Sequence, residues 1–185
     1  GPAHFAHTRL SILDLSPQGR QPFDVCTPEG RFIALANGEL YNHAALRTQI
    51  LSRYPQASIA PSDCAVLPWL AADDLDEVPA KLDGMFAVAL WDDTRQRLLL
   101  ARDPAGQKPL YYASTPGGGL VFGSELKSVL THPHVKRDLD PLSMRQFLAF
   151  DFVPMERSIY TGVKKLRPGE RLIWQRGHHE VQRFA

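Results

Sequence analysis

Hydrophobic and polar residues alternate along several short stretches of the chain, a pattern typical of half-buried β-strands. Residues 8–15 alternate in this way, and residues 31–36 form a more continuous apolar run that predicts a buried strand. The dipeptide Asn37-Gly38 follows directly, and this pair is a strong signal for a tight hairpin turn. We therefore expect the buried strand to end at residue 36 and to turn at Asn37-Gly38.

Apolar residues recur at helical spacing in the next part of the chain. Residues 42–53 predict a helix with Asn42 as its N-cap. A second helix follows, with Ser62 or Asp63 as its cap, and Pro68 fits it only in the first turn, where no backbone donor is needed.

The middle of the chain is rich in predicted strands. The spacing of four strand-like runs predicts an antiparallel meander, and these runs are residues 84–91, 97–102, 109–113 and 119–123. Two helices follow, over 124–130 and 141–150. A late strand comes after them at 171–174 and turns at Arg176-Gly177. This order of elements predicts an α+β fold in which antiparallel sheets are sandwiched with helices, in one domain over residues 1–185.

Composition and charge exclude several classes of protein. The chain has 185 residues, with 21 Lys and Arg against 20 Asp and Glu, so we expect neither nucleic acid nor a membrane as a partner. Two cysteines, Cys26 and Cys64, are too few for a disulfide framework and fit a reducing compartment. No apolar run approaches the roughly 20 residues that span a bilayer. We expect a cytoplasmic protein.

Three groups of polar residues are candidates for chemistry. Residues 37–42 place an amide, an exposed backbone N–H and a carboxylate close together, which suits an oxyanion and an ammonium group; the alternative is a hairpin turn with helix capping. Arg9 suits a carboxylate ligand, and the alternative is a surface or structural ion pair. Asp63 suits a substrate amine, and the alternative is a helix cap.

Seven sequence blocks occur in an order that resembles a known family. They are His7-Thr8-Arg9-Leu10-Ser11-Ile12-Leu13-Asp14, Asn37-Gly38-Glu39-Leu40-Tyr41-Asn42, Ser62-Asp63-Cys64, Asp83-Gly84-Met85-Phe86-Ala87, Ala101-Arg102-Asp103, Gly106-Gln107-Lys108-Pro109-Leu110-Tyr111-Tyr112 and Ser124-Glu125-Leu126-Lys127. From about His4 to its end, the chain resembles the class II glutamine amidotransferase domain of glutamine-dependent asparagine synthetases.

The resemblance implies a fold and a set of site residues. The implied fold is a four-layer αββα N-terminal-nucleophile hydrolase sandwich, here without its N-terminal strand. Arg9 matches the residue that holds the α-carboxylate of L-glutamine, and Glu39 and Asp63 match the acidic groups that receive its α-amino group. Asn37 and Gly38 match the oxyanion hole, through the side-chain amide and the backbone N–H.

The chain departs from the family pattern in two places. The family nucleophile is an N-terminal cysteine, and this chain begins with Gly1-Pro2, so we expect an N-terminal truncation and an inactive chain as given. Ala65 stands where the family usually has glutamate. We expect neither Cys64 nor Cys26 to replace the nucleophile, because neither has a base or cationic partner in the sequence pattern.

The resemblance also implies partners and cofactors. We expect no cofactor and no metal in this domain, and ATP and magnesium in a synthetase domain of the same parent protein that lies outside this sequence. An open sheet edge left by the missing strand also favours a homodimer. The leading interpretation is a glutaminase that supplies ammonia to its synthetase. The alternative is a catalytically dead domain that serves as a scaffold or docking element.

Overall fold

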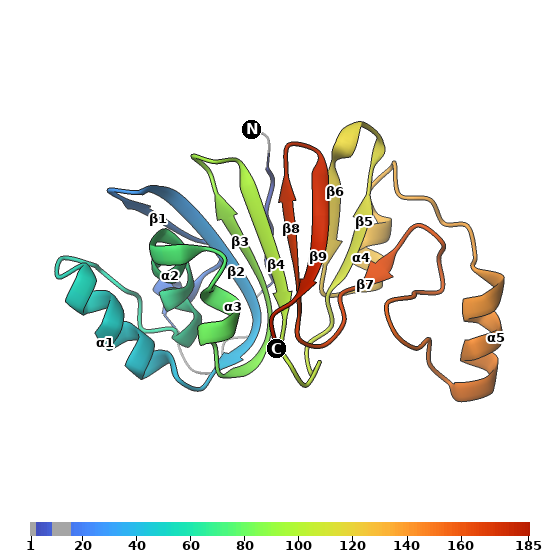
Figure 1. Cartoon of the computed structure of the whole chain (residues 1–185), viewed down its shortest axis with the longest axis horizontal. Helices are drawn as coiled ribbons and strands as arrows, with labels where there is room; N and C mark the ends of the chain where they lie inside the picture. Colours follow the sequence, from blue (N-terminus) through green and yellow to red (C-terminus); the bar gives the residue numbers. More distant parts are fainter. Residues whose placement is uncertain (1–2, 9–15) are drawn as a thin grey trace.

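Two antiparallel sheets form the centre of the chain in the computed structural model, which describes residues 3–8 and 16–185 (Figure 1). The larger sheet has the strand order β1-β2-β3-β4-β8-β9 and the smaller one the order β6-β5-β7. The strands are β1 (Phe23–Thr27), β2 (Gly30–Leu40), β3 (Gly84–Asp92), β4 (Arg97–Arg102), β5 (Tyr111–Ser114), β6 (Leu120–Gly123), β7 (Lys164–Lys165), β8 (Glu170–Gln175) and β9 (His178–Arg183). The helices are α1 (His43–Arg53), α2 (Leu67–Asp74), α3 (Val78–Lys81), α4 (Leu126–Leu130) and α5 (Pro141–Phe150), with 3-10 turns η1 (Pro17–Gly19), η2 (Asp63–Val66) and η3 (Pro116–Gly118).

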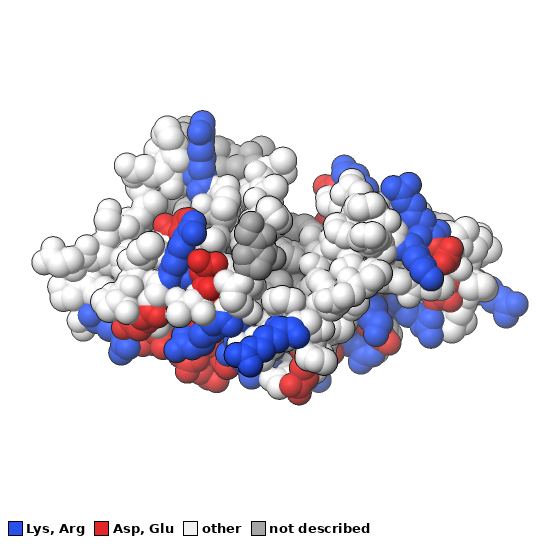
Figure 2. Space-filling model, turned by 90° about the horizontal axis from the view of Figure 1, so that it is seen from above, with Lys and Arg blue, Asp and Glu red and all other residues white. Residues whose placement is uncertain are grey.

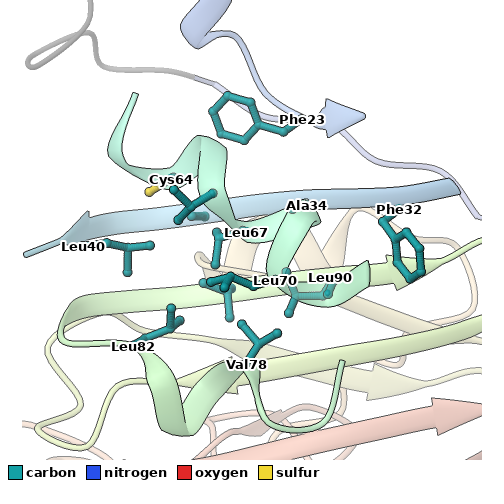
Figure 3. Close-up of a cluster of buried hydrophobic side chains, with 14 of the residues drawn as sticks. Phe23, Phe32, Ala34, Leu40, Cys64, Leu67, Leu70, Val78, Leu82 and Leu90 are labelled. Carbon is teal, nitrogen blue, oxygen red and sulfur yellow. The ribbon is translucent and has the colours of Figure 1, made fainter. Parts of the chain in front are cut away.

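One face of the larger sheet is covered by α2 and its neighbouring helices. Leu67 and Leu70 of α2 pack between Leu40 of β2 and Leu90 of β3, and all four side chains are buried (Figure 3). Burying a leucine side chain contributes about 1.5–3 kcal/mol, so this cluster holds the helical layer onto the sheet.

The opposite face of the larger sheet packs against the smaller sheet. Ala89 and Trp91 of β3 lie in one cluster with Tyr112 of β5 and Phe122 of β6. β3 is therefore buried on both faces, which explains its nearly continuous apolar sequence. On the far side of the smaller sheet, Val129 of α4 is fully buried in a third cluster. These clusters confirm the expected α+β arrangement of antiparallel sheets with helices on them.

The hairpin turn expected at Asn37-Gly38 is wrong. β2 continues through both residues to Leu40, and Gly38 pairs with Phe86 of β3. Gly38 has φ +148°, and a Cβ atom on it would lie 1.9 Å from the carbonyl oxygen of Met85. Glycine is therefore required here by the close approach of two strands, and not by a turn.

The expected four-strand meander is also wrong. β3 pairs with β4, but β4 pairs next with β8, while β5 joins the smaller sheet between β6 and β7. The chain thus crosses from one sheet to the other between β4 and β5. The β4–β8 and β5–β7 pairings join segments that are far apart in the sequence, and local spacing does not reveal such pairings.

Predictions of individual helices and strands are confirmed where the predicted strand pairing is not. The expected helices over 42–53, 124–130 and 141–150 and the strand over 171–174 are confirmed as α1, α4, α5 and β8. Pro68 lies in the first turn of α2, where its lack of a backbone N–H removes no helical hydrogen bond. The expected strand over 8–15 falls almost entirely outside the described residues.

The expected helix caps occupy the cap positions without capping through their side chains. Asn42 precedes α1, but its side chain donates to the carbonyl of Lys81 (2.9 Å) and accepts from the N–H of Asp83 (3.1 Å). Ser62 precedes η2 and likewise makes no side-chain cap bond. Asn42 therefore ties the start of α1 to the segment that leads into β3.

Surface charges are mixed in sign. Lys and Arg side chains lie among Asp and Glu side chains on the face seen in Figure 2, in keeping with the net charge of +1. No helix of the described residues is both long and apolar enough to cross a membrane.

The crossing between the two sheets is organised by Asp103, whose side chain is fully buried. Its carboxylate accepts hydrogen bonds from the backbone N–H groups of Gln107 (2.9 Å), Lys108 (3.0 Å) and Phe86 (3.3 Å). The neighbouring Arg102 donates to three backbone carbonyls, those of Gly106 (2.6 Å), Lys108 (2.7 Å) and Leu166 (2.9 Å). These bonds join β3, the crossing loop and the segment after β7.

Asp103→Ala should lower the free energy of unfolding by about 3–5 kcal/mol, because it leaves three backbone N–H groups without their acceptor. The matched control is Asp138→Ala at an exposed position, which should change stability by less than about 0.5 kcal/mol. Urea denaturation followed by tryptophan fluorescence measures both. Equal effects at the two positions would contradict this role for Asp103.

Candidate functional site

The candidate site lies at the end of β2, where this strand and β3 approach most closely. Leu40 pairs with Gly84, and a Cβ atom on Gly84 would lie 2.1 Å from the carbonyl oxygen of Glu39. Glycines on both strands, Gly38 and Gly84, thus allow the two backbones to come within a distance that any side chain would prevent. Asn37, Gly38 and Glu39 occupy this stretch of β2.

The side chains of Asn37 and Glu39 are half-buried and available to a ligand. Within residues 3–8 and 16–185, neither side chain makes a hydrogen bond or an ion pair. Their polar atoms are not among the fully buried ones and no described residue occupies them, so a ligand that enters from solvent can bind them.

Asp63 is brought to the same place by a hydrogen bond to the backbone of β2. Its Oδ2 accepts from the N–H of Leu40 at 2.8 Å, and its Oδ1 accepts from the hydroxyl of Ser62 at 3.3 Å. Asp63 is 7% exposed. The interpretation of Asp63 as a helix cap is therefore wrong, because its side chain binds the end of a strand distant in sequence.

Two carboxylates, those of Glu39 and Asp63, act electrostatically on the Cys64 thiol. Glu39 and Asp63 both contribute to raising the pKa of the Cys64 thiol, after burial, which is the largest cause. A negative charge from either residue disfavours a thiolate at Cys64, and only a nearby charge acts in this way. Two acidic groups beside an unpaired amide suit a ligand that carries an ammonium group and an amide or carbonyl.

α1 fixes the segment that carries Asp63. Arg47 of α1 donates to the carbonyls of Ile59 (3.0 Å), Ala60 (2.6 Å) and Ser62 (3.4 Å). No pattern in the sequence predicted this role of Arg47, which follows the buried Leu46 in α1.

Two further residues position the strand on its other side. His7 Nε2 lies 3.1 Å from the carbonyl oxygen of Ala36, and the side-chain amide of Gln21 both donates to that oxygen (3.0 Å) and accepts from the Ala36 N–H (2.6 Å). His7 belongs to the first of the seven sequence blocks, and no pattern in the sequence predicted a role for Gln21. Arg9, the expected carboxylate ligand, lies outside the described residues.

Cys64 is a core residue. It is 3% exposed, packs in the core cluster next to β2 (Figure 3), and its thiol donates to Asp63 Oδ2 at 3.4 Å. Its raised pKa keeps the thiol protonated at neutral pH, in agreement with the expectation that it is not a nucleophile. Ala65 is buried in the same cluster, so a side chain the size of glutamate would not fit there without rearrangement.

A separate hollow of about 560 Å³ is lined by none of the four described candidate residues, Asn37, Gly38, Glu39 and Asp63. Its walls include Arg102, Phe152, Lys165, Arg167 and Arg183. Among the described residues, no three His, Cys, Asp or Glu side chains converge as a metal site would require.

Comparisons with known proteins identify the family of the chain. A family model described as a glutamine amidotransferase domain matches residues 1–185. Asparagine synthetase [glutamine-hydrolyzing] 3 of Bacillus subtilis is 34% identical over 97% of this chain, which covers 29% of that protein. Amidase chry2 of Gibberella zeae is 34% identical over 95% of this chain, which covers 25% of that protein. The chain thus spans less than a third of the length of these relatives.

A solved structure shares the fold. Glutamine phosphoribosylpyrophosphate amidotransferase from B. subtilis superposes with a TM-score of 0.64 at 22% identity, covering 97% of this chain and 34% of that one.

Gly38→Ala should lower the free energy of unfolding by about 3–5 kcal/mol, because the added Cβ would overlap the Met85 carbonyl and the backbone φ disfavours any side chain. Gly162→Ala is the matched control, since the nearest atom to its added Cβ is 3.9 Å away and its φ is unexceptional. We expect the control to change stability by less than about 1 kcal/mol. Thermal and urea denaturation measure both variants, and a tolerant Gly38 would refute the close approach.

Thiol labelling under native conditions should modify one cysteine per chain. Cys26 is exposed and Cys64 is buried with a raised pKa, so iodoacetamide at pH 8 should label Cys26 alone, and both only after unfolding. Peptide mass spectrometry identifies the labelled residue. Native labelling of Cys64 at a rate comparable to Cys26 would contradict its burial.

Proposed function

The chain belongs to the class II glutamine amidotransferase domain family, and on that premise we propose that it is the glutamine-hydrolysing domain of an ATP-dependent amidotransferase similar to asparagine synthetase. Residues 1–185 form this one domain, with the four-layer αββα arrangement of N-terminal-nucleophile hydrolases. The synthetase domain, with its ATP and magnesium, belongs to the rest of the parent protein.

The observation that carries the proposal is the pair of unpartnered side chains, Asn37 and Glu39, held beside Asp63. Within the described part of the chain, Asn37 and Glu39 have no hydrogen-bonding partner, although both are half-buried. L-Glutamine supplies the missing groups, because it carries an α-ammonium group for the carboxylates and a side-chain amide for Asn37. Arg9 receives its α-carboxylate in this proposal.

Each residue then has a defined task in hydrolysis. A cysteine thiolate attacks the carboxamide carbon of glutamine, and the carbonyl oxygen becomes an oxyanion that accepts from the Asn37 side chain and the Gly38 N–H. Collapse of this intermediate breaks the C–N bond and releases ammonia, and water then hydrolyses the thioester to glutamate. The thiol is that of the N-terminal cysteine implied by the family, since Cys64 is buried and protonated.

The strand geometry supports this assignment of the oxyanion site. Gly38 and Gly84 let the backbones of β2 and β3 approach closely, and this pairing fixes the position of the Gly38 N–H at the end of β2. Donors fixed in advance stabilise a developing charge without reorganising during the reaction. The proposal extends to the release of ammonia; the acceptor is left open, because relatives of similar identity are named both asparagine synthetase and amidase.

Asn37→Ala in the complete parent protein should lower kcat for glutamine hydrolysis about 100- to 1,000-fold with little change in KM, because the oxyanion forms only during the reaction. Coupled detection of glutamate and ammonia measures this. An unchanged kcat would remove Asn37 from the oxyanion site.

Glu39→Gln should instead raise KM, because it removes a negative charge that binds the α-ammonium group. Loss of one charge-assisted hydrogen bond corresponds to about 1.5–3 kcal/mol, or roughly a 10- to 150-fold loss in kcat/KM. Glutamine at position 39 has the same size and leaves no described partner unpaired, so stability should not change. Glu77→Gln, at an exposed position on the turn before α3, is the matched control.

A parent protein that hydrolyses no glutamine at all would favour the scaffold interpretation.

A further inference from the structure

The edge of β2 that faces away from β3 carries a row of backbone groups. In an antiparallel pair, residues whose backbones bond to each other alternate with residues whose N–H and C=O groups point away from the partner strand. The N–H and carbonyl of Phe86 both bond to Asp103, so Phe86 and its partner Gly38 are a pair of the second kind. The backbone groups of Gly38, and those of Ala36 and Leu40 two residues away, therefore point to this outer edge.

The strand β1 covers only the first part of the outer edge. Its pairing with β2 ends where Phe23 lies opposite Ala34. If β1 continued in the same register, Gly19 would lie opposite Gly38 and its backbone would cover the Gly38 N–H. Gly19 lies in η1 instead, so the edge beyond Ala34 is left to other partners.

The side chain of Gln21 takes the place of a strand at Ala36. Its amide nitrogen donates to the Ala36 carbonyl (3.0 Å), and its amide oxygen accepts from the Ala36 N–H (2.6 Å). A residue of a paired strand makes the same two bonds through its backbone. His7 Nε2 donates to the same carbonyl (3.1 Å), because a carbonyl oxygen can only accept. Both backbone groups of Ala36 are thus bonded without a further strand.

The edge is closed again at Leu40 and open in between. The Leu40 N–H donates to Asp63 Oδ2 (2.8 Å). Within residues 3–8 and 16–185, no group accepts from the Gly38 N–H. Gln21 and Asp63 therefore occupy the positions on either side of one open donor. A side-chain amide suits this arrangement because it pairs with a single residue, whereas a strand would continue past it.

The bonds of Gln21 also act on the second donor of the oxyanion site. The Ala36 carbonyl belongs to the planar peptide group that joins Ala36 to Asn37. Holding this carbonyl from Gln21 and His7 fixes the orientation of that peptide, and with it the position from which the Asn37 side chain extends. A misplacement of about 1 Å in a group that acts on the reaction can cost about 100-fold in rate.

We propose that Gln21 is a positioning residue of the oxyanion site. Its side chain fixes the Ala36 peptide and ends the coverage of the β2 edge before Gly38, so that the Gly38 N–H stays open and in place for the carbonyl oxygen of glutamine. Gln21 acts through Ala36 and does not touch the reacting atoms. This role rests on the proposed function for the reaction that the open donor serves.

Glutamine hydrolysis by the complete parent protein tests the role of Gln21. Gln21→Leu removes both bonds to Ala36 at similar side-chain size. We expect kcat to fall about 10- to 100-fold while KM changes less than about threefold, because the oxyanion exists only during the reaction. Gln18→Leu is the matched control, since Gln18 is exposed in η1 and its side chain makes no hydrogen bond within the described ranges. A joint change in KM and kcat of similar size would indicate general damage and overturn the positioning role.

A second variant keeps one of the two bonds. Gln21→Glu retains an acceptor for the Ala36 N–H but loses the donor, and it places a carboxylate oxygen against the Ala36 carbonyl. We expect kcat to fall at least about tenfold with KM little changed, and this variant serves if Gln21→Leu does not fold. Gln18→Glu is the control for the added charge and should retain the wild-type kcat. A wild-type kcat in Gln21→Glu would overturn the role.

Residue-resolved amide hydrogen exchange tests the edge without reference to activity. In the parent protein without glutamine, the Gly38 N–H should exchange at least about tenfold faster than those of Ala36 and Leu40, which have side-chain acceptors. Gln21→Leu should accelerate exchange at Ala36 at least about tenfold and leave Leu40, which Asp63 holds, unchanged. Slow exchange at Gly38 would mean that another group covers this donor, and the inference would be wrong.

The results distinguish the role of Gln21 from the proposed function. Glutamine hydrolysis that neither Gln21 variant slows would refute the positioning role and leave the proposed function standing. A selective loss of kcat in these variants, together with fast exchange at Gly38, would support both. A parent protein that hydrolyses no glutamine would refute both.

Discussion

The close contact between the backbones of β2 and β3 is the constraint on which the rest of the site depends. At Gly38 and Gly84 an added Cβ would lie 1.9 and 2.1 Å from carbonyl oxygens of the opposing strand. Only glycine satisfies both positions, and β2 pairs with β3 through to Leu40, which lies opposite Gly84. Asp63 can then accept from the Leu40 N–H, and the acidic side of the site is assembled from parts of the chain that are far apart in sequence.

The same contact connects the site to the crossing between the sheets. Phe86 lies opposite Gly38, and its N–H and carbonyl bond to the side chain and backbone N–H of Asp103. Arg102, beside it, binds the carbonyl of Leu166 in the segment after β7. Several of the sequence blocks that carry the family resemblance therefore have a structural task. They position the strand, while Asn37 and Glu39 remain without structural partners among the described residues and are left for a ligand.

Local patterns in the sequence predicted the elements, and tertiary contacts decided the rest. Helical spacing was sufficient for α1, because that pattern is set by neighbouring turns of one helix. Asn37-Gly38 was misread because the same dipeptide suits both a tight turn and a close strand contact, and only Met85 of the opposing strand distinguishes them. The residue type of Asp63 predicted a carboxylate that binds a substrate amine. Its hydrogen bond to the Leu40 N–H depends on the segment before η2, whose backbone carbonyls Arg47 binds.

The exposed helix α5 shows a limit of helical periodicity as a guide to burial. The helix over 141–150 was predicted correctly, and its apolar residues would ordinarily indicate a place in a core. In the described structure the core is complete without them: both faces of β3 and the inner face of α4 are already buried. The apolar side chains of α5 therefore add nothing to the core of the described residues, and the hydrogen bonds of Asp140 to Ser143 and Arg157 hold the helix in place instead.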